Sequence, residues 1–153
     1  MENTKIQNLK IQVKYLNESV KRIGFDAEGK GDWIDLFLAE PVKMKAGEHK
    51  LLHLGVAMKL PEGYEAILAP RSSTFGKYGI LQANSIGVID NSYSGPQDWW
   101  KLSAYATRDV SIEKDTKIAQ FRIQLRQGRD IGIEEVAELD GKNRGGFGST
   151  GTK

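Results

Sequence analysis

Short segments in which apolar and polar residues alternate, separated by glycines, limit the folds open to this chain more than any other feature. The clearest is Ala119–Arg126, where the apolar residues carry odd numbers and the polar residues even numbers. This period of two is typical of a strand with one face in the core and one in water. The sequence predicts further strands over Leu9–Tyr15, Trp33–Leu38, Leu51–Leu60 and Tyr64–Ala69. Glu134–Leu139 fits a helix or a strand, and we expect a strand there.

Helical periodicity is confined to Ser72–Tyr78, where a hydroxyl residue soon after Pro70 is suited to cap a helix. Glycine contributes 17 of the 153 residues, about 11% against an average near 7%, and its clusters are typical of tight turns between short strands. We therefore expect an all-β sandwich or barrel with one short helix. The chain length favours one domain, since domains commonly have roughly 100–200 residues.

The residues that are missing exclude several kinds of chemistry. Without cysteine, the chain has no disulfide, no thiolate nucleophile and no zinc site of the base-deaminase type. Two histidines are too few for a three-histidine metal site. With 22 basic and 20 acidic residues, the formal charge of +2 predicts neither a nucleic-acid nor a membrane partner. The polar start, Met1–Lys10, does not have the apolar stretch of an export signal, so we expect a cytoplasmic protein.

The last part of the sequence combines glycines, hydroxyls and cations. From Asp140 onward the only apolar residue is Phe147, so this segment cannot form a core of its own. The glycines of Arg144–Gly151 would let backbone N–H groups approach phosphate oxygens closely, whereas a frayed terminus is the alternative interpretation. We expect one β-rich domain over residues 1–141 and a flexible arm over residues 142–153.

Two internal segments carry groups suited to phosphate binding and acid–base chemistry. In the first, Arg71 offers a planar fork that matches phosphate, and the alternative is a helix cap with a solvated arginine. In the second, Asn84–Gly95, the pattern predicts a hairpin with polar groups at its bend. Asp90 directly follows an apolar pair there, so that burial would favour a role as general base; an aspartate that opens a turn is the alternative. Asp35 lies within a predicted strand, where a carboxylate needs a partner or an ion.

Five motifs in this order resemble those of the trimeric dUTP pyrophosphatase (dUTPase) family, most closely its phage and Gram-positive branch. They are Ile34–Leu36, Pro70–Ser73, Asn84 with Gly87–Tyr93, Ile118–Gln120 and Gly145–Gly151. The resemblance implies a jelly-roll, β-barrel-like subunit with a flexible glycine-rich C-terminal arm. It also implies a homotrimer whose active sites are each built from all three chains, and Mg²⁺-dependent hydrolysis of dUTP to dUMP and pyrophosphate.

The same resemblance implies a role for each motif residue. Asp90 would be the general base that activates a water for attack at the α-phosphorus. Asn84 and the backbone of Gly87–Ile89 would read the uracil edge, in a hairpin too tight for the methyl group of thymine. Tyr93 would pack on the deoxyribose and leave no space for a 2′-hydroxyl.

The triphosphate would be held by two sets of residues, because it carries about four negative charges that must be neutralised and positioned. The first set is Arg71, Ser72, Ser73 and Gln120. The second set lies on the arm and consists of Arg144, Gly148, Ser149 and Thr150, with Phe147 placed over the base. Mg²⁺ would bridge the three phosphates, and Asp35 would hold its waters rather than the ion itself.

Departures from the family pattern leave alternatives open. Trp33 and Ile34 precede Asp35, where Ala-Gly is usual. Lys117 ends the triplet that stands where Gly-Asp-Arg is usual, which removes an acid and an arginine from that place. The usual arginine of the last motif falls at Lys142, so the arm clamp is Lys142, Arg144 or both. Trp99 or Trp100 would contribute to an aromatic lid, or else pack at a subunit interface.

Two other functions compete with dUTP hydrolysis. dCTP deaminase shares the fold and works without zinc, but the Gly-Val-Ile-Asp-x-x-Tyr context of Asp90 favours phosphohydrolysis. A regulatory protein partner, bound in addition to or instead of catalysis, is known for some phage dUTPases. The short stretch Phe121–Lys142 between the last two motifs argues against a large docking insert.

Overall fold

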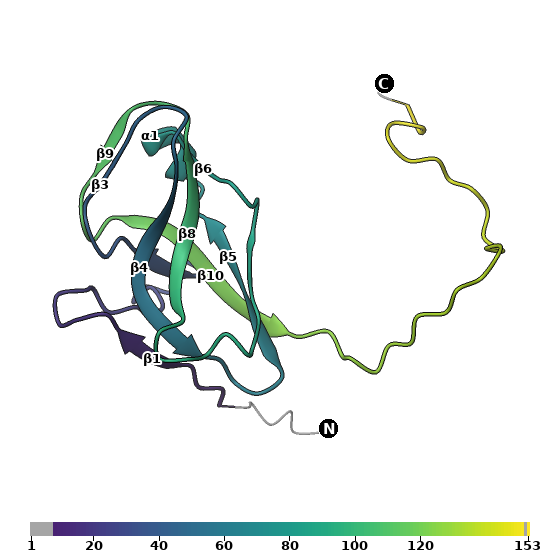
Figure 1. The fold of residues 1–153 in the computed structure, drawn as a ribbon, viewed down its shortest axis with the longest axis horizontal. Coiled ribbons are helices and arrows are strands. Elements are labelled where there is room, and N and C mark those ends of the chain that lie inside the picture. Colours follow the sequence, from purple (N-terminus) through teal and green to yellow (C-terminus); the bar gives the residue numbers. More distant parts are fainter. Residues whose placement is uncertain (1–7, 152) are drawn as a thin grey trace.

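The computed structural model describes residues 8–151 and 153. Most of its strands belong to two four-stranded antiparallel sheets (Figure 1). The first sheet has the order β1 (Gln12–Tyr15), β4 (His49–Lys59), β8 (Trp99–Ala106) and β6 (Ile80–Gln82). The second has the order β2 (Ile34–Phe37), β10 (Lys117–Leu125), β5 (Tyr64–Pro70) and β7 (Gly87–Ile89). A separate pair joins β3 (Val42–Met44) to β9 (Val110–Ile112). Thr152 and most of the polar start, Met1–Lys10, lie outside the described residues.

The core lies between the two large sheets and is built from the inward residues of their central strands. Trp100 on β8 and Phe121 on β10 are fully buried and meet edge to face, with ring centroids 5.0 Å apart and planes at 78°. This arrangement suits the quadrupoles of two aromatic rings. Trp100 is therefore a core residue, and its proposed place in an aromatic lid or at a subunit interface is wrong. Only Trp99, which is half-buried on the outer face of β8, remains available for those roles.

The predicted all-β, jelly-roll-like architecture with one short helix, α1 (Thr74–Tyr78), is confirmed. The alternating segment Ala119–Arg126 corresponds to most of β10, and from Ala119 onward the even-numbered and odd-numbered residues of this strand lie on opposite faces. The other four predicted strands before residue 70 are also present, with ends that differ by up to three residues. No helix among the described residues is long and apolar enough to cross a membrane.

Three local predictions are corrected. Glu134–Leu139 forms no strand, because the chain leaves the sandwich after β10 and has no strand beside it there. The helix begins at Thr74 rather than Ser72, and Ser73 at its N-cap makes no capping hydrogen bond with its side chain. The hairpin expected around Val88 and Ile89 is also wrong, since β6 and β7 belong to different sheets and β7 pairs with β5.

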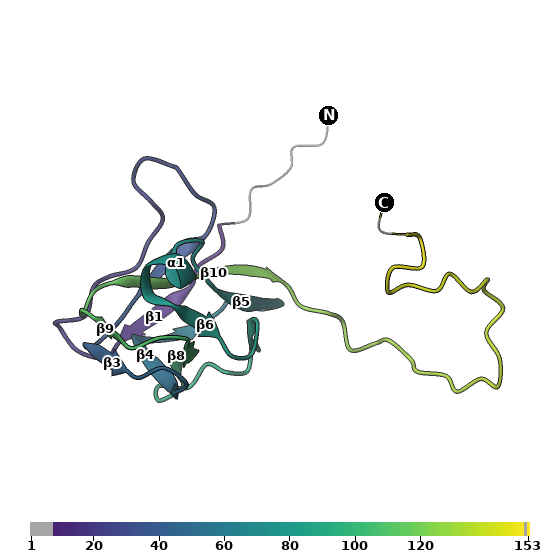
Figure 2. The same ribbon diagram turned by 90° about the horizontal axis from the view of Figure 1, so that it is seen from above.

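The C-terminal segment extends away from the sandwich. After β10 ends at Leu125, the backbone N–H of Arg126 still donates to the Gly63 carbonyl over 2.9 Å. Residues 127–151 then contain neither helix nor strand. Both views show this segment running outward from the sheets, in green to yellow (Figures 1 and 2).

Candidate functional site

Asp35, Arg71, Lys117 and Gln120 form one polar group, called here the Arg71 cluster. Asp35 on β2 lies beside Gln120 on β10, and Ala69 near the end of β5 lies on the other side of Gln120. The Arg71 guanidinium is 2.9 Å from one carboxylate oxygen of Asp35, and the Lys117 ammonium is 3.5 Å from the other. The Gln120 side-chain amide donates to the Pro70 carbonyl over 3.2 Å. Neighbouring strands thus bring together the residues of three predicted motifs.

The Asp35 ion pairs decide two of the open alternatives. Arg71 is not a solvated arginine on a helix cap, because Asp35 holds its guanidinium in a fixed orientation with about a third of the side chain exposed. Lys117, in the triplet that departs from the family pattern, still supplies a cation to the same carboxylate. This pairing was not predicted, since only strand register places Lys117 near Asp35.

The loop that carries Arg71 and Ser72 is anchored by a buried threonine. The Thr74 hydroxyl accepts a hydrogen bond from the Arg71 backbone N–H over 3.0 Å and donates to the Ile118 carbonyl over 2.9 Å. Thr74 is almost fully buried, whereas Ser72 is exposed and Ser73 is half-buried. The sequence had suggested a hydroxyl cap in this segment, but the hydroxyl that fixes the loop is one that was not singled out.

A second group of predicted residues lies on β7 and the turn that follows it. Ile89 pairs with Ala66 on β5, and the chain then turns so that the Tyr93 backbone N–H donates to the Asp90 carbonyl over 3.0 Å. Asn91 anchors this turn, because its side-chain amide donates to the Pro61 and Tyr64 carbonyls over 2.9 and 2.8 Å. Asp90 itself is exposed, so the burial that the sequence suggested is not found in the single chain.

Tyr93 is fixed by a contact across its own loop. Its hydroxyl donates to the Trp99 carbonyl over 2.9 Å, while 39% of the residue remains exposed. Partial burial, followed by the negative charge of Asp98, raises the pKa of Tyr93. The hydroxyl therefore remains a hydrogen-bond donor at neutral pH, and the ring is held at the surface where a sugar can pack on it.

The Arg71 cluster and Asp90 lie at opposite ends of β5. Asp90 lines a cavity of about 580 Å³ with Glu65, Asn91, Arg126 and Arg129, none of which belongs to the Arg71 cluster. From Glu65 to Arg71 an extended strand spans about 20 Å, at roughly 3.3 Å per residue. A general base acts only within about 3 Å of its proton, or through one water. One chain therefore does not bring Asp90 and Arg71 to the same phosphate group.

The arm residues are not brought to either group within the chain. Ser149 makes local contacts only among those described: its hydroxyl accepts from the Gly146 backbone N–H over 2.8 Å and donates to the Arg144 carbonyl over 3.2 Å. Phe147 is fully exposed, as are Ile133 and Leu139 for the most part. In both views the segment lies away from the sheets (Figures 1 and 2).

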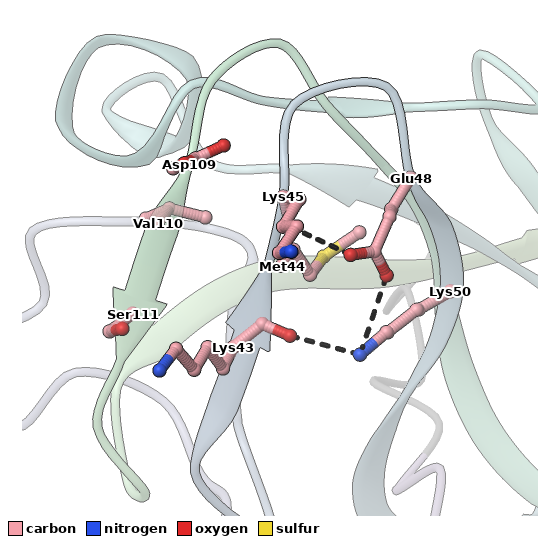
Figure 3. Close-up of a pocket in the computed structure, with 8 residues that line it drawn as sticks. All are labelled: Lys43, Met44, Lys45, Glu48, Lys50, Asp109, Val110 and Ser111. Carbon is pink, nitrogen blue, oxygen red and sulfur yellow. Dashed lines mark hydrogen bonds and ion pairs between the residues drawn. The ribbon is translucent and has the colours of Figure 1, made fainter.

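A separate pocket of about 530 Å³ opens between β3, β4 and β9 and is lined by three lysines (Figure 3). None of the predicted site residues reaches it. The Lys50 ammonium is already held by the Lys43 carbonyl over 2.9 Å and by Glu48 over 3.6 Å. Among residues 8–151, no group of three His, Cys, Asp or Glu side chains could hold a metal ion.

Comparison with known proteins gives one family and one fold. The family model described as dUTPase matches residues 33–151. The SPbeta prophage-derived deoxyuridine 5′-triphosphate nucleotidohydrolase YosS of Bacillus subtilis is 51% identical over 145 residues, which cover 95% of this chain and 100% of that protein. The deoxyuridine 5′-triphosphate nucleotidohydrolase of Clostridium novyi is 37% identical, with 94% of this chain and 99% of that protein covered.

Solved structures match the fold at lower identity. The dUTPase of Staphylococcus bacteriophage 80alpha, solved with dUPNHPP, superposes with a TM-score of 0.78 at 22% identity and covers 94% of this chain and 99% of its own. A variant dUTPase from phage phi11 of S. aureus, described with a structural Mg(II) ion, gives a TM-score of 0.70 at 21% identity, over 85% and 98% of the two chains. These structures support the jelly-roll-like arrangement of the sheets.

Proposed function

The chain belongs to the dUTPase family and is an enzyme of the dUTP diphosphatase class, and we propose that it cleaves dUTP to dUMP and pyrophosphate with Asp90 as general base. Asp90 would take a proton from a water that attacks the α-phosphorus, and the bond to the bridging oxygen of the leaving pyrophosphate would break. The position of Asp90 supports this role, because the pairing of Ile89 with β5 fixes the backbone before it and the Asn91 anchors fix the backbone after it.

The Arg71 cluster would bind the phosphate chain. Arg71 offers donors beyond the one paired with Asp35, and Ser72 beside it is exposed and free to face a phosphate. Gln120 lies in the same row of the sheet and completes this surface. Asp35 keeps the guanidinium oriented before substrate arrives, which lowers the cost of ordering it on binding.

Mg²⁺ fits this arrangement as an ion carried by the triphosphate, whose charge it would neutralise. Mg²⁺ usually keeps several waters and binds through substrate phosphates with one or two carboxylates. Asp35 has about four lone-pair positions and two cationic partners, which leaves room to accept hydrogen bonds from metal-bound waters.

The separation of the Arg71 cluster from Asp90 is the observation that carries the proposal of a shared active site. We infer that Asp90 of one subunit faces the Arg71 cluster of another in a homotrimer. A third chain would supply its arm, residues 142–153, with Arg144, Phe147, Gly148, Ser149 and Thr150 closing over the nucleotide bound to the domain of residues 1–141. The exposed side chain of Phe147 on the arm, and those of Ile133 and Leu139 in the stretch that leads to it, support a contact of the C-terminal part with another copy.

Base selection would be made by Asn84 and the backbone of Gly87–Ile89, and sugar selection by Tyr93. Asn84 is exposed on the bend that leads into β7, where its amide can pair with a base edge. The Tyr93 ring is fixed through its hydroxyl, so a ribose 2′-hydroxyl would meet a rigid surface. Since nucleoside triphosphates are cytoplasmic substrates, we place the reaction in the cytoplasm.

Hydrolysis of a nucleotide panel tests the proposed activity. With Mg²⁺ present, we expect pyrophosphate release from dUTP and at least about 100-fold lower kcat/KM for dTTP, dCTP, dATP and dGTP. Chelation of the metal should suppress the reaction. Release of ammonia from dCTP would assign deamination instead.

A second candidate function is the binding of a regulatory protein partner. Binding of such a partner by a catalytically inactive variant would separate this function from catalysis.

A further inference from the structure

Gln82 is a buried polar residue for which the proposed mechanism has no role. It ends β6, and 8% of the residue is exposed, although it lies on a short strand at the edge of its sheet. Its side-chain N–H donates to the Leu68 carbonyl over 3.2 Å, while its side-chain oxygen is buried without a hydrogen-bond partner. A hydrocarbon side chain would avoid the cost of that unpaired oxygen, so the amide group needs a specific explanation.

The Gln82 hydrogen bond joins the two sheets at the base of one bend. Gln82 pairs with Ala104 in the first sheet, whereas Leu68 belongs to β5 of the second and pairs with Gly87. Residues 83–86, called here the base-reading bend, connect Gln82 to Gly87. The Gln82 side chain, at the start of the bend, is thus hydrogen-bonded to Leu68, the residue of β5 that lies beside Gly87 at the end of the bend.

One backbone hydrogen bond ties the start of the base-reading bend to the first sheet, from the Ala83 N–H to the Ser103 carbonyl over 2.8 Å, and the other hydrogen bonds of the bend are local. The Ser85 backbone N–H donates to the Gln82 carbonyl over 3.1 Å, and the Ile86 N–H donates to the Asn84 carbonyl over 2.7 Å. Ser85 has a positive φ of 64°, a conformation uncommon for a residue with a side chain. Contacts over two or three residues fix the shape of a turn but not the width of its opening. The link from Gln82 to Leu68 fixes that width.

The packing beneath Gly87 shows that this end of the bend has little space to move toward Leu68 or Gln82. A Cβ atom built on Gly87 would lie 3.0 Å from the Leu68 Cβ and 3.4 Å from the Gln82 side-chain nitrogen. Gly87 therefore sits directly on the pair that forms the link. Loss of the link would allow β6 and β7 to move apart and the bend to open.

We propose that Gln82 is a positioning residue that sets uracil specificity, by clamping the base-reading bend so that it is too narrow for a 5-methyl group. This inference rests on the proposed function of the bend, in which Asn84 and Gly87–Ile89 read the base. Gln82 acts through the bend and does not touch the nucleotide. Its amide is required because only a side-chain N–H at this position reaches the Leu68 carbonyl across the two sheets.

Two substitutions of Gln82 test the clamp by nucleotide binding, which does not depend on hydrolysis. Gln82→Met keeps the length of the side chain without its amide, and Gln82→Leu replaces it with a shorter, branched side chain; both remove the N–H donor and the unpaired oxygen. For both we expect the preference for dUMP over dTMP, measured by titration calorimetry, to fall by about tenfold, because exclusion of one methyl group is worth 10- to 200-fold. In turnover, KM for dUTP should rise more than kcat falls.

Ile80→Val is the matched control, since Ile80 is buried on the same strand but makes no part of the link. It should lower the melting temperature and leave the dUMP preference unchanged. A purely structural Gln82 would behave in the same way, so an unchanged preference in the folded Gln82→Met or Gln82→Leu protein would overturn the proposal. If the wild-type chain prefers dUMP yet hydrolyses no dUTP, the proposed activity fails while the clamp is still tested.

Discussion

Replacing Asp90 with asparagine should lower kcat for dUTP by about 10³-fold, because general-base catalysis contributes roughly 10²- to 10⁴-fold. Asparagine keeps the shape of the side chain but takes no proton from the attacking water. We expect the fold to be unchanged, because Asp90 is exposed and the turn that follows it is anchored by Asn91. Binding of a non-hydrolysable dUTP analogue should therefore persist, and steady-state kinetics with titration calorimetry separates the two effects.

Asp109→Asn is the control for the loss of one carboxylate. Asp109 lines the lysine pocket of Figure 3, which none of the predicted site residues reaches, and its carboxylate accepts the Ala46 backbone N–H over 2.8 Å. We expect its turnover to stay close to that of the wild type. An Asp90→Asn protein that turns over at the wild-type rate would mean that another group serves as the base.

Deletion of Lys142–Lys153 should reduce kcat/KM by at least about 10²-fold, since the segment would close the site and hold the β- and γ-phosphates. Stability should not change, because the described residues of this segment make only local hydrogen bonds and leave Phe147 fully exposed. Activity assays and thermal unfolding of the same preparation measure both quantities. Phe147→Ala, which removes only the aromatic ring, should lower kcat/KM by a smaller factor and also leave the stability unchanged.

Either of two results would contradict the account of the arm. A truncated protein that unfolds at a clearly lower temperature would show that the segment stabilises the domain. A truncated protein with full activity would show that the site closes without it. Lys142→Ala and Arg144→Ala, measured separately, then identify the cation that holds the phosphates.

The strands that could be predicted from sequence are those with one clearly apolar face. β10 is an example, since Phe121 and Ala119 face the core while Gln120 and Arg122 alternate with them. β8 escaped prediction although its burial alternates as regularly, because its outward residues include Trp99 and Tyr105 and its inward residues include small alanines. Hydrophobicity alone does not show the direction of such side chains.

The sequence identified which residues belong to the candidate site, but not how these residues are arranged in space. Motif order identified Asp35, Arg71 and Gln120, and their proximity follows from the pairing of β2, β10 and β5. The position of Asp90 at the far end of β5 depends on the register of β7, which no local pattern encodes. Gln82 gave no signal, because a glutamine before a turn is usually exposed and only the three-dimensional packing shows that it is buried.

The error at Glu134–Leu139 has a related cause. Apolar residues at these positions suggested a strand, yet the segment has no strand beside it in the single chain and its apolar side chains remain exposed. A strand needs a neighbour to pair its backbone groups.

Mixing two inactive variants tests the shared active site most directly. The Asp90→Asn and Arg71→Ala proteins should each be nearly inactive when prepared alone. The two chains are then co-expressed with different tags, and oligomers that contain both are purified. If Asp90 and Arg71 of one site come from different subunits of a trimer, one site in three of each mixed trimer carries neither substitution, and about a third of the wild-type activity returns. Mixed oligomers that remain as inactive as the separate variants would contradict the shared site.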